Sequence, residues 1–184
     1  MKILSLALLT IAILSKSLSA QEKNILRPHI LDFEFLLGDF DVTVNLPDGN
    51  GGWNRAGNGK SVLTTALDGT FIEENKATGI GNTSLTMKNI IGIDPRTKEF
   101  RLFALDKEYG TMDIYRGRRE DKSIVFDNVS SDARFVSQNG LSYAFRLTYA
   151  FVKKNENSLY VESTTDDGKT WTPYAKITYK RVGS

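Results

Sequence analysis

The sequence predicts an all-β protein: a single antiparallel, up-and-down β-barrel of about ten strands, with a short helix at its N-terminal end. From residue 40 onward, apolar and polar residues alternate with a period of two, as in strands that bury one face. Turn-forming residues interrupt these segments roughly every 8–12 residues. Because each strand hairpins onto the next and closure removes exposed sheet edges, we favour a barrel over the alternative, a Greek-key sandwich.

Residues 1–20 have the layout of a secretory signal peptide. Lys2 precedes an apolar run over residues 3–14, and small residues follow up to Ala20. The run is shorter than the roughly 20 apolar residues that span a bilayer. We therefore expect cleavage after Ala20 and an exported barrel domain over residues 21–184, periplasmic or extracellular, with no membrane span. An uncleaved N-terminal anchor is the alternative.

The charge pattern argues against a nucleic-acid partner. The chain has 24 Lys and Arg against 22 Asp and Glu, and removal of residues 1–20 takes away two lysines, so the remaining domain is formally neutral. Nucleic-acid binding needs a basic stripe instead. One basic cluster, residues 116–119, is followed at once by acidic residues, and we interpret it as a solvated strand end.

Ahead of the first strand, residues 24–37 are expected to form a short helical or irregular lid. Leu31, Phe33 and Phe35 would face inward, and Gly38 would end the segment as a helix C-cap does.

The strands are then expected in close succession. Their ranges are 40–46, 62–67, 71–77, 85–93, 100–105, 111–116, 123–129, 143–151, 159–164 and 174–181. Residues 47–52 are rich in Pro, Asp, Asn and Gly and predict an open loop, while Asp68-Gly69 predicts a tight hairpin.

Most catalytic chemistry finds no support in the composition. There is no cysteine, and a single histidine, His29, precedes the first strand, so neither a Ser-His-Asp arrangement nor a zinc site is expected. No cofactor is expected either. An enzyme built on this chain would use carboxylates or tyrosines, with Glu73 as the leading acid. Its neighbour Glu74 would point to the opposite face of the strand.

Residues 164–171, Thr-Thr-Asp-Asp-Gly-Lys-Thr-Trp, match the aspartate box, with Asp166, Gly168 and Trp171 as its defining positions. We interpret it as a structural hairpin in which Asp166 accepts backbone N–H bonds and Trp171 packs beneath the turn. A sugar or calcium site is the alternative.

The segment around Gly38 resembles the opening of lipocalin-like barrels, where a short helix is followed by glycine, any residue and an aromatic residue. The resemblance implies that Phe40 takes the aromatic position, usually Trp, and that Arg181 on the last strand lies across it and caps the helix end. Together with Ile91-Gly92-Ile93-Asp94-Pro95 and the terminal Asp-Gly-Lys-Thr-Trp, these residues resemble a family of exported, largely bacterial proteins of unknown function. Related haem-binding barrels use a late histidine, which this chain lacks.

Polar residues among apolar neighbours predict a small-molecule site inside the barrel. Asn89 and Arg116 are the predicted polar ligand-binding residues, and an interior arginine suits a carboxylate. Tyr143, Phe145 and Tyr149 alternate along the strongest strand and are the predicted apolar wall. The alternatives are that Arg116 reaches water at a strand end and that the aromatic row is plain core.

We therefore predict an exported barrel that binds a small, mainly apolar molecule without catalysis. Two alternatives come from other classes of protein. One is a carboxylate-dependent hydrolase or isomerase that relies on Glu73, and the other is a protein-interaction module that uses Trp53.

Overall fold

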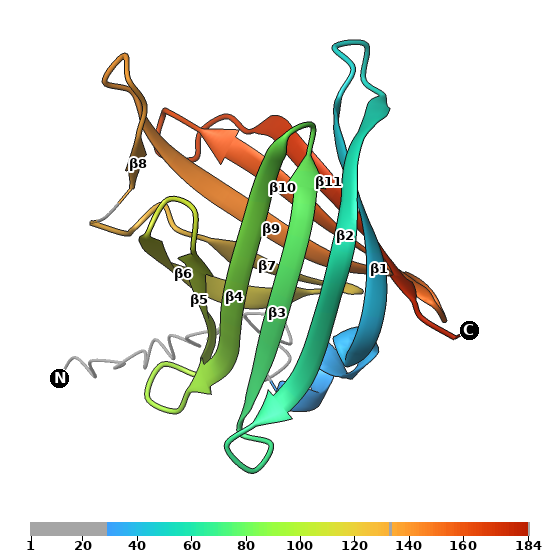
Figure 1. Cartoon of the computed structure of the whole chain (residues 1–184). Coiled ribbons are helices and arrows are strands. Elements are labelled where there is room, and N and C mark those ends of the chain that lie inside the picture. Colours follow the sequence, from blue (N-terminus) through green and yellow to red (C-terminus); the bar gives the residue numbers. More distant parts are fainter. Residues whose placement is uncertain (1–28, 133, 184) are drawn as a thin grey trace, which may run out of the picture.

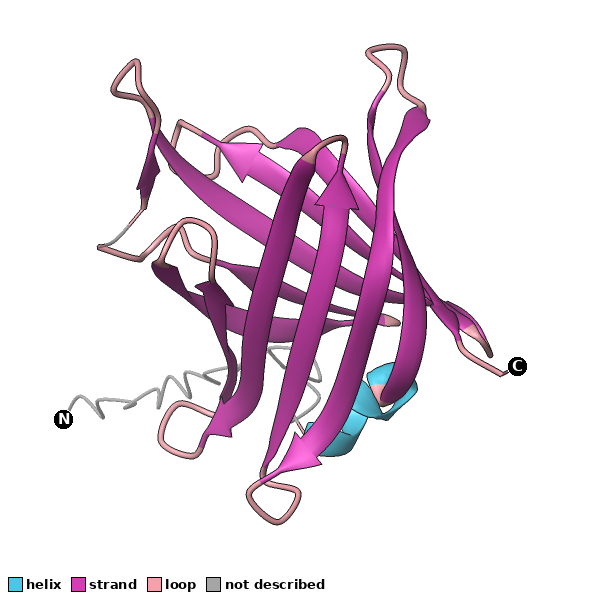
Figure 2. Cartoon of the chain, viewed as in Figure 1, coloured by secondary structure: helices cyan, strands magenta, loops and turns pink. Residues whose placement is uncertain are grey.

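The computed structural model describes residues 29–183 except residue 133, and the chain folds into a β-barrel that a short helix covers at one end (Figure 1 and Figure 2). The elements are η1 (Ile30–Leu36), β1 (Gly38–Pro47), β2 (Trp53–Ala66), β3 (Phe71–Ile80), β4 (Thr83–Asp94), β5 (Glu99–Asp106), β6 (Thr111–Glu120), β7 (Ser123–Asp127), β8 (Phe135–Val136), β9 (Ser142–Lys153), β10 (Glu156–Thr164) and β11 (Thr172–Arg181). The predicted signal peptide and the start of the predicted lid lie outside the described residues.

Ten strands form a closed antiparallel ring. Each of β1 to β6 pairs with the next strand, β7 pairs with β9, and β11 pairs with β1. The pairing of β9 with β10 closes the ring, while the two-residue β8 pairs only with the start of β9. The predicted up-and-down barrel is confirmed.

One strand boundary differs clearly from the expectation. β2 begins at Trp53, because residues 53–61 pair with β1 across a bulge at Val44 and Asn45. The glycines here mark a close approach of backbones. A Cβ on Gly59 would lie 2.0 Å from the Ala77 carbonyl oxygen of β3. Glycine in a strand interior often marks such a close approach of another backbone.

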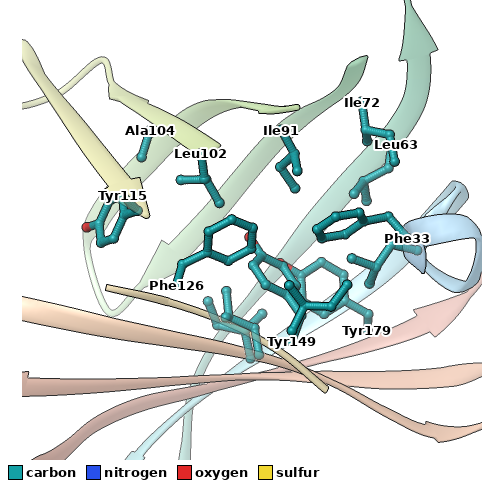
Figure 3. Close-up of a cluster of buried hydrophobic side chains, with 14 of the residues drawn as sticks. Phe33, Leu63, Ile72, Ile91, Leu102, Ala104, Tyr115, Phe126, Tyr149 and Tyr179 are labelled. Atoms are coloured by element: carbon teal, nitrogen blue, oxygen red, sulfur yellow. The ribbon is translucent and has the colours of Figure 1, made fainter. Parts of the chain in front are cut away.

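The helix plugs the lower end of the barrel with Phe33. The Phe33 ring meets Phe100 edge-on at a centroid distance of 5.0 Å and stacks on Phe126 at 6.0 Å. Phe33 and Phe126 are labelled in Figure 3. In a 3₁₀-helix, side chains three residues apart lie on one side, so Phe33 and Leu36 are the fully buried pair. The prediction that Leu31 faces inward is wrong for the same reason, since its side chain is 61% exposed.

Arg181 fastens the helix to the barrel. Its guanidinium carbon lies 4.8 Å from the centroid of the Phe40 ring, and its nitrogens donate to the carbonyl oxygens of Leu37 at 2.6 Å and Phe35 at 3.3 Å. Gly38 makes room for it, because a Cβ there would lie 2.2 Å from Arg181 Nη1, and the φ of +127° also favours glycine.

Replacement of Arg181 by alanine should lower the free energy of unfolding by about 1–3 kcal/mol, because the helix-end carbonyls lose their donors and Phe40 loses its cover. Urea denaturation measures this change. Lys180→Ala, an exposed neighbour on the same strand, is the matched control and should shift stability by less than about 0.5 kcal/mol. An unchanged unfolding midpoint in Arg181→Ala would contradict the role of this contact.

Candidate functional site

A polar cluster lies inside the barrel, centred on Glu74 of β3. The Glu74 side chain is completely buried. Its carboxylate accepts three hydrogen bonds: from Ser61 Oγ at 2.7 Å, from Asn89 Nδ2 at 2.6 Å and from Tyr179 Oη at 2.9 Å. These donors come from three other strands, so the cluster exists only in the closed ring.

Lys76 balances the charge of Glu74. Its Nζ lies 3.7 Å from Glu74 Oε1 and donates to the Tyr179 hydroxyl at 3.4 Å. Burial raises the pKa of the Glu74 carboxyl, but the Lys76 charge and the bonds from Ser61, Asn89 and Tyr179 together lower it by more. Glu74 is therefore ionised, and its carboxylate accepts hydrogen bonds from the protein rather than donating a proton.

Two polar atoms of this layer remain without a hydrogen-bond partner among the described residues: the Tyr149 hydroxyl and Asn89 Oδ1. Burial raises the pKa of the Tyr149 hydroxyl well above its usual value, and the nearby Glu74 carboxylate adds to this effect. Tyr149 is thus a neutral hydroxyl in the barrel interior.

At the end of the barrel opposite η1, the structure has a hollow of about 460 Å³, which we call the mouth hollow. Strand ends and hairpins of β5, β6, β8, β9 and β11 surround it. Its lining residues are Asp106, Tyr109, Thr111, Met112, Asp113, Arg134, Phe135, Phe145 and Tyr174. A bulge between Val161 and Glu162 of β10 shifts the register of β11 next to Tyr174, whose ring lies 5.5 Å from that of Phe145.

Three of the predicted apolar wall residues fall at different depths. Phe145 lines the mouth hollow, and the Tyr143 ring is tilted against that of Phe135, with the ring centroids 6.0 Å apart. Tyr149 lies deeper, buried edge-on against Phe126 (Figure 3). Asn89 faces inward as expected, but it binds Glu74 and is not in the wall of the mouth hollow.

The interior placement predicted for Arg116 is wrong. Along β6, Asp113, Tyr115 and Gly117 face inward, while Arg116 is exposed on the outer face. The apolar residues Met112 and Ile114 lie on the same side of β6 as Arg116, at 57% and 42% exposure, although Met112, at the strand end, also borders the mouth hollow. Their apolar side chains made this face resemble the inner one in the sequence. Gly117 could have indicated the inner face of β6, because its missing side chain leaves room for Phe126 and Phe100 inside the barrel.

Glu73 and Glu74 exchange the roles that the sequence suggested. Glu73 lies on the outer face and pairs with Lys88 at 3.0 Å. Its pKa is lowered, first by the hydrogen bond from Asn75 and then by the one from Lys88. Polar residues occupy both faces of β3, so alternation alone could not tell which face turns inward.

The aspartate box forms a hairpin turn before β11. Asp166 accepts bonds from Thr164 Oγ1 at 2.6 Å and from the Thr170 backbone N–H at 2.9 Å. Gly168 has φ of +81°, and the Trp171 ring lies under the Arg146 guanidinium at 4.5 Å. The carboxylate oxygens of Asp166 accept hydrogen bonds from residues of the turn itself, which agrees with the structural interpretation.

Trp53 lies at the start of β2, with its ring 6.5 Å from that of Tyr160. The two rings lie in the wall of a smaller surface hollow of about 260 Å³ with Glu162 and Pro173. This hollow is separate from the mouth hollow and shares none of its residues.

Within residues 29–183 without residue 133, no group of three or more His, Cys, Asp and Glu side chains is arranged to hold a metal ion. The same residues contain no helix long and apolar enough to cross a membrane.

Fold and site together define a ten-stranded up-and-down barrel with a plugged lower end, a charge-balanced interior and an aromatic hollow at its mouth. The chain belongs to the family described as protein of unknown function (DUF1579), whose model matches residues 33–181.

A protein of unknown function from the DUF3598 family of Nostoc punctiforme aligns with 84% of this chain and 99% of its own, at 8% identity and a TM-score of 0.23. Among curated proteins no match was found. The description of the fold therefore rests on the strand pairing of this chain.

Glu74→Gln should destabilise the protein by about 3–5 kcal/mol, because it leaves the Lys76 ammonium buried without its counter-charge. The double variant Glu74→Gln/Lys76→Met should recover most of this loss. Glu73→Gln, one residue away on the outer face, should leave the unfolding midpoint nearly unchanged, because exposed ion pairs contribute little to stability. Thermal and urea unfolding of the four proteins measure the difference.

The stability of the wild-type protein should also depend on pH through Glu74. The pKa of Glu74 is lowered in the fold, so its stabilisation is present above the pKa of the unfolded chain and disappears as pH falls through the folded pKa. The double variant should lack this acid-side loss. Equal acid sensitivity in both proteins would contradict the assignment.

Proposed function

We propose that this protein is an exported, lipocalin-like barrel that binds a small, mainly apolar molecule at its open end. The observation that carries the proposal is the mouth hollow. Its volume of about 460 Å³ falls within the range of small-molecule sites, and its wall combines aromatic side chains with a few polar ones. That combination buries an apolar body and orients it through polar contacts.

The lower end of the barrel supports entry from the mouth. Phe33 and Leu36 fill the barrel beside η1, and Arg181 holds the helix in place. The Glu74 cluster lies in the same cross-strand row as Asp113 of the hollow, through the pairings of Glu74 with Asn89, Asn89 with Ala104 and Ala104 with Asp113. A ligand that enters the barrel would therefore meet aromatic walls first and hydrogen-bonding groups behind them.

The carboxylate-dependent enzyme is less well supported. Glu73 lies outside the barrel, and Glu74 is ionised and fully engaged in hydrogen bonds. General acid catalysis near neutral pH needs a carboxyl with a raised pKa, whereas the pKa values of both residues are lowered.

An environment-sensitive apolar dye should bind the mouth hollow with increased fluorescence. Tyr174→Ala should raise its Kd about 2- to 10-fold, because loss of one aromatic contact costs about 0.5–1.5 kcal/mol. Tyr174 is 55% exposed, so the variant should keep its fold. Phe103→Ala, which removes a ring from the outer face of β5, is the control and should leave Kd unchanged. Absence of saturable dye binding to the wild type would defeat the proposal.

Export is tested separately. If residues 1–20 are a signal peptide, protein recovered from outside the cytoplasm should begin at Gln21 or within one or two residues of it. N-terminal sequencing or intact-mass measurement decides this. Recovered protein that still begins at Met1 would overturn the proposal of a cleaved leader.

A further inference from the structure

The charges around the mouth hollow do not balance. Asp106, Asp113 and Arg134 all lie in its wall. Arg134 donates to Asp167 at 2.7 Å and also to the Val129 carbonyl oxygen, so its charge is already paired outside the hollow. Neither Asp106 nor Asp113 forms an ion pair with any described residue.

Asp106 and Asp113 also accept few hydrogen bonds from the protein. Asp106 accepts a bond from the Tyr109 backbone N–H at 3.0 Å, and Asp113 accepts one long bond from the Tyr115 hydroxyl at 3.5 Å. Burial raises the pKa of the Asp113 carboxyl, and the neighbouring charge of Asp106 raises it further. An added anion would worsen this repulsion, whereas a cation would relieve it.

Other charged groups nearby are already occupied or point elsewhere. Lys76 of β3 serves Glu74 and Tyr179. Lys107, in the turn after β5, lines a neighbouring hollow with three further lysines, Lys60, Lys76 and Lys88, and none of the four lies in the wall of the mouth hollow. Asp106 borders both hollows, whereas Asp113 borders only the mouth hollow. The wall of the mouth hollow therefore has excess negative charge.

Aromatic rings surround the same space. Tyr109, Phe135, Phe145 and Tyr174 contribute side chains to the wall, and Phe145 and Tyr174 meet at an interplanar angle of 73°. The faces of aromatic rings carry negative potential and attract cations within about 6 Å. Rings together with unpaired carboxylates are the side chains that bind ammonium groups.

We infer that the mouth hollow binds an organic cation, an amine or quaternary ammonium compound with an apolar body, with Asp113 and Asp106 facing the charge and the aromatic rings surrounding it. The inference rests on the proposed small-molecule site and names its ligand class. It replaces the carboxylate ligand that an interior Arg116 would have suited.

Three probes of similar size test the inference by displacement of the apolar dye: benzyltrimethylammonium, its neutral isostere neopentylbenzene, and the anion 3-phenylpropanoate. The cation should displace the dye about tenfold more effectively than the neutral isostere. The anion should be the weakest. Lowering the pH should weaken the cation alone, because protonation of Asp113 removes its negative charge.

Asp113→Asn keeps the shape and removes the charge, so it should weaken the cation about fivefold or more and leave the neutral isostere within about twofold. Asp121→Asn removes the same charge at the opposite end of the barrel and is the matched control. Equal displacement by all three probes, or an unchanged preference in Asp113→Asn, overturns the inference and leaves the proposed function standing. Failure of the dye itself to bind defeats both.

Discussion

Ten strands in a closed ring enclose more space than their own inward side chains easily fill. The helix and a polar cluster fill part of this space, and a hollow remains at one end. At the lower end, η1 inserts Phe33 among Phe100 and Phe126, and Arg181 clamps the helix through its carbonyl oxygens. In the middle, a polar cluster fills the ring. At the upper end no helix of the described residues covers the barrel (Figure 1), and the wall there opens into the mouth hollow.

The interior treats its charges in two different ways. Glu74 is surrounded by donors and paired with Lys76, so that layer is neutral and stabilises the ring from several strands at once. Asp113 lies two strand pairings from Asn89, across Ala104 of β5, and accepts only a long hydrogen bond from Tyr115. Glu74, whose carboxylate has its hydrogen-bond partners, belongs to a structural layer. Asp113, whose carboxylate has few, belongs to a binding surface.

Alternation along the chain was enough to predict the ring but not always its inner face. In β9, Phe145, Leu147 and Tyr149 do turn inward, because no comparable apolar set occupies the other face. In β6 both faces carry apolar residues, and Met112 and Ile114 proved to be outside. The contact of Arg181 with Phe40 was expected from a resemblance of motifs, and the resolved geometry places the guanidinium across the ring.

The sequence alone determined the all-β class, the order of the strands and the turn at Asp166, because these depend on period-two patterning and on local backbone preferences. Only the tertiary structure decided that Glu74, Lys76, Asn89 and Tyr179 meet, and that Asp113 shares a hollow with Phe145 and Tyr174. Those residues lie on different strands, and their meeting depends on register and ring closure. Register is a property of strand pairing, and a one-residue change in it turns every side chain to the opposite face.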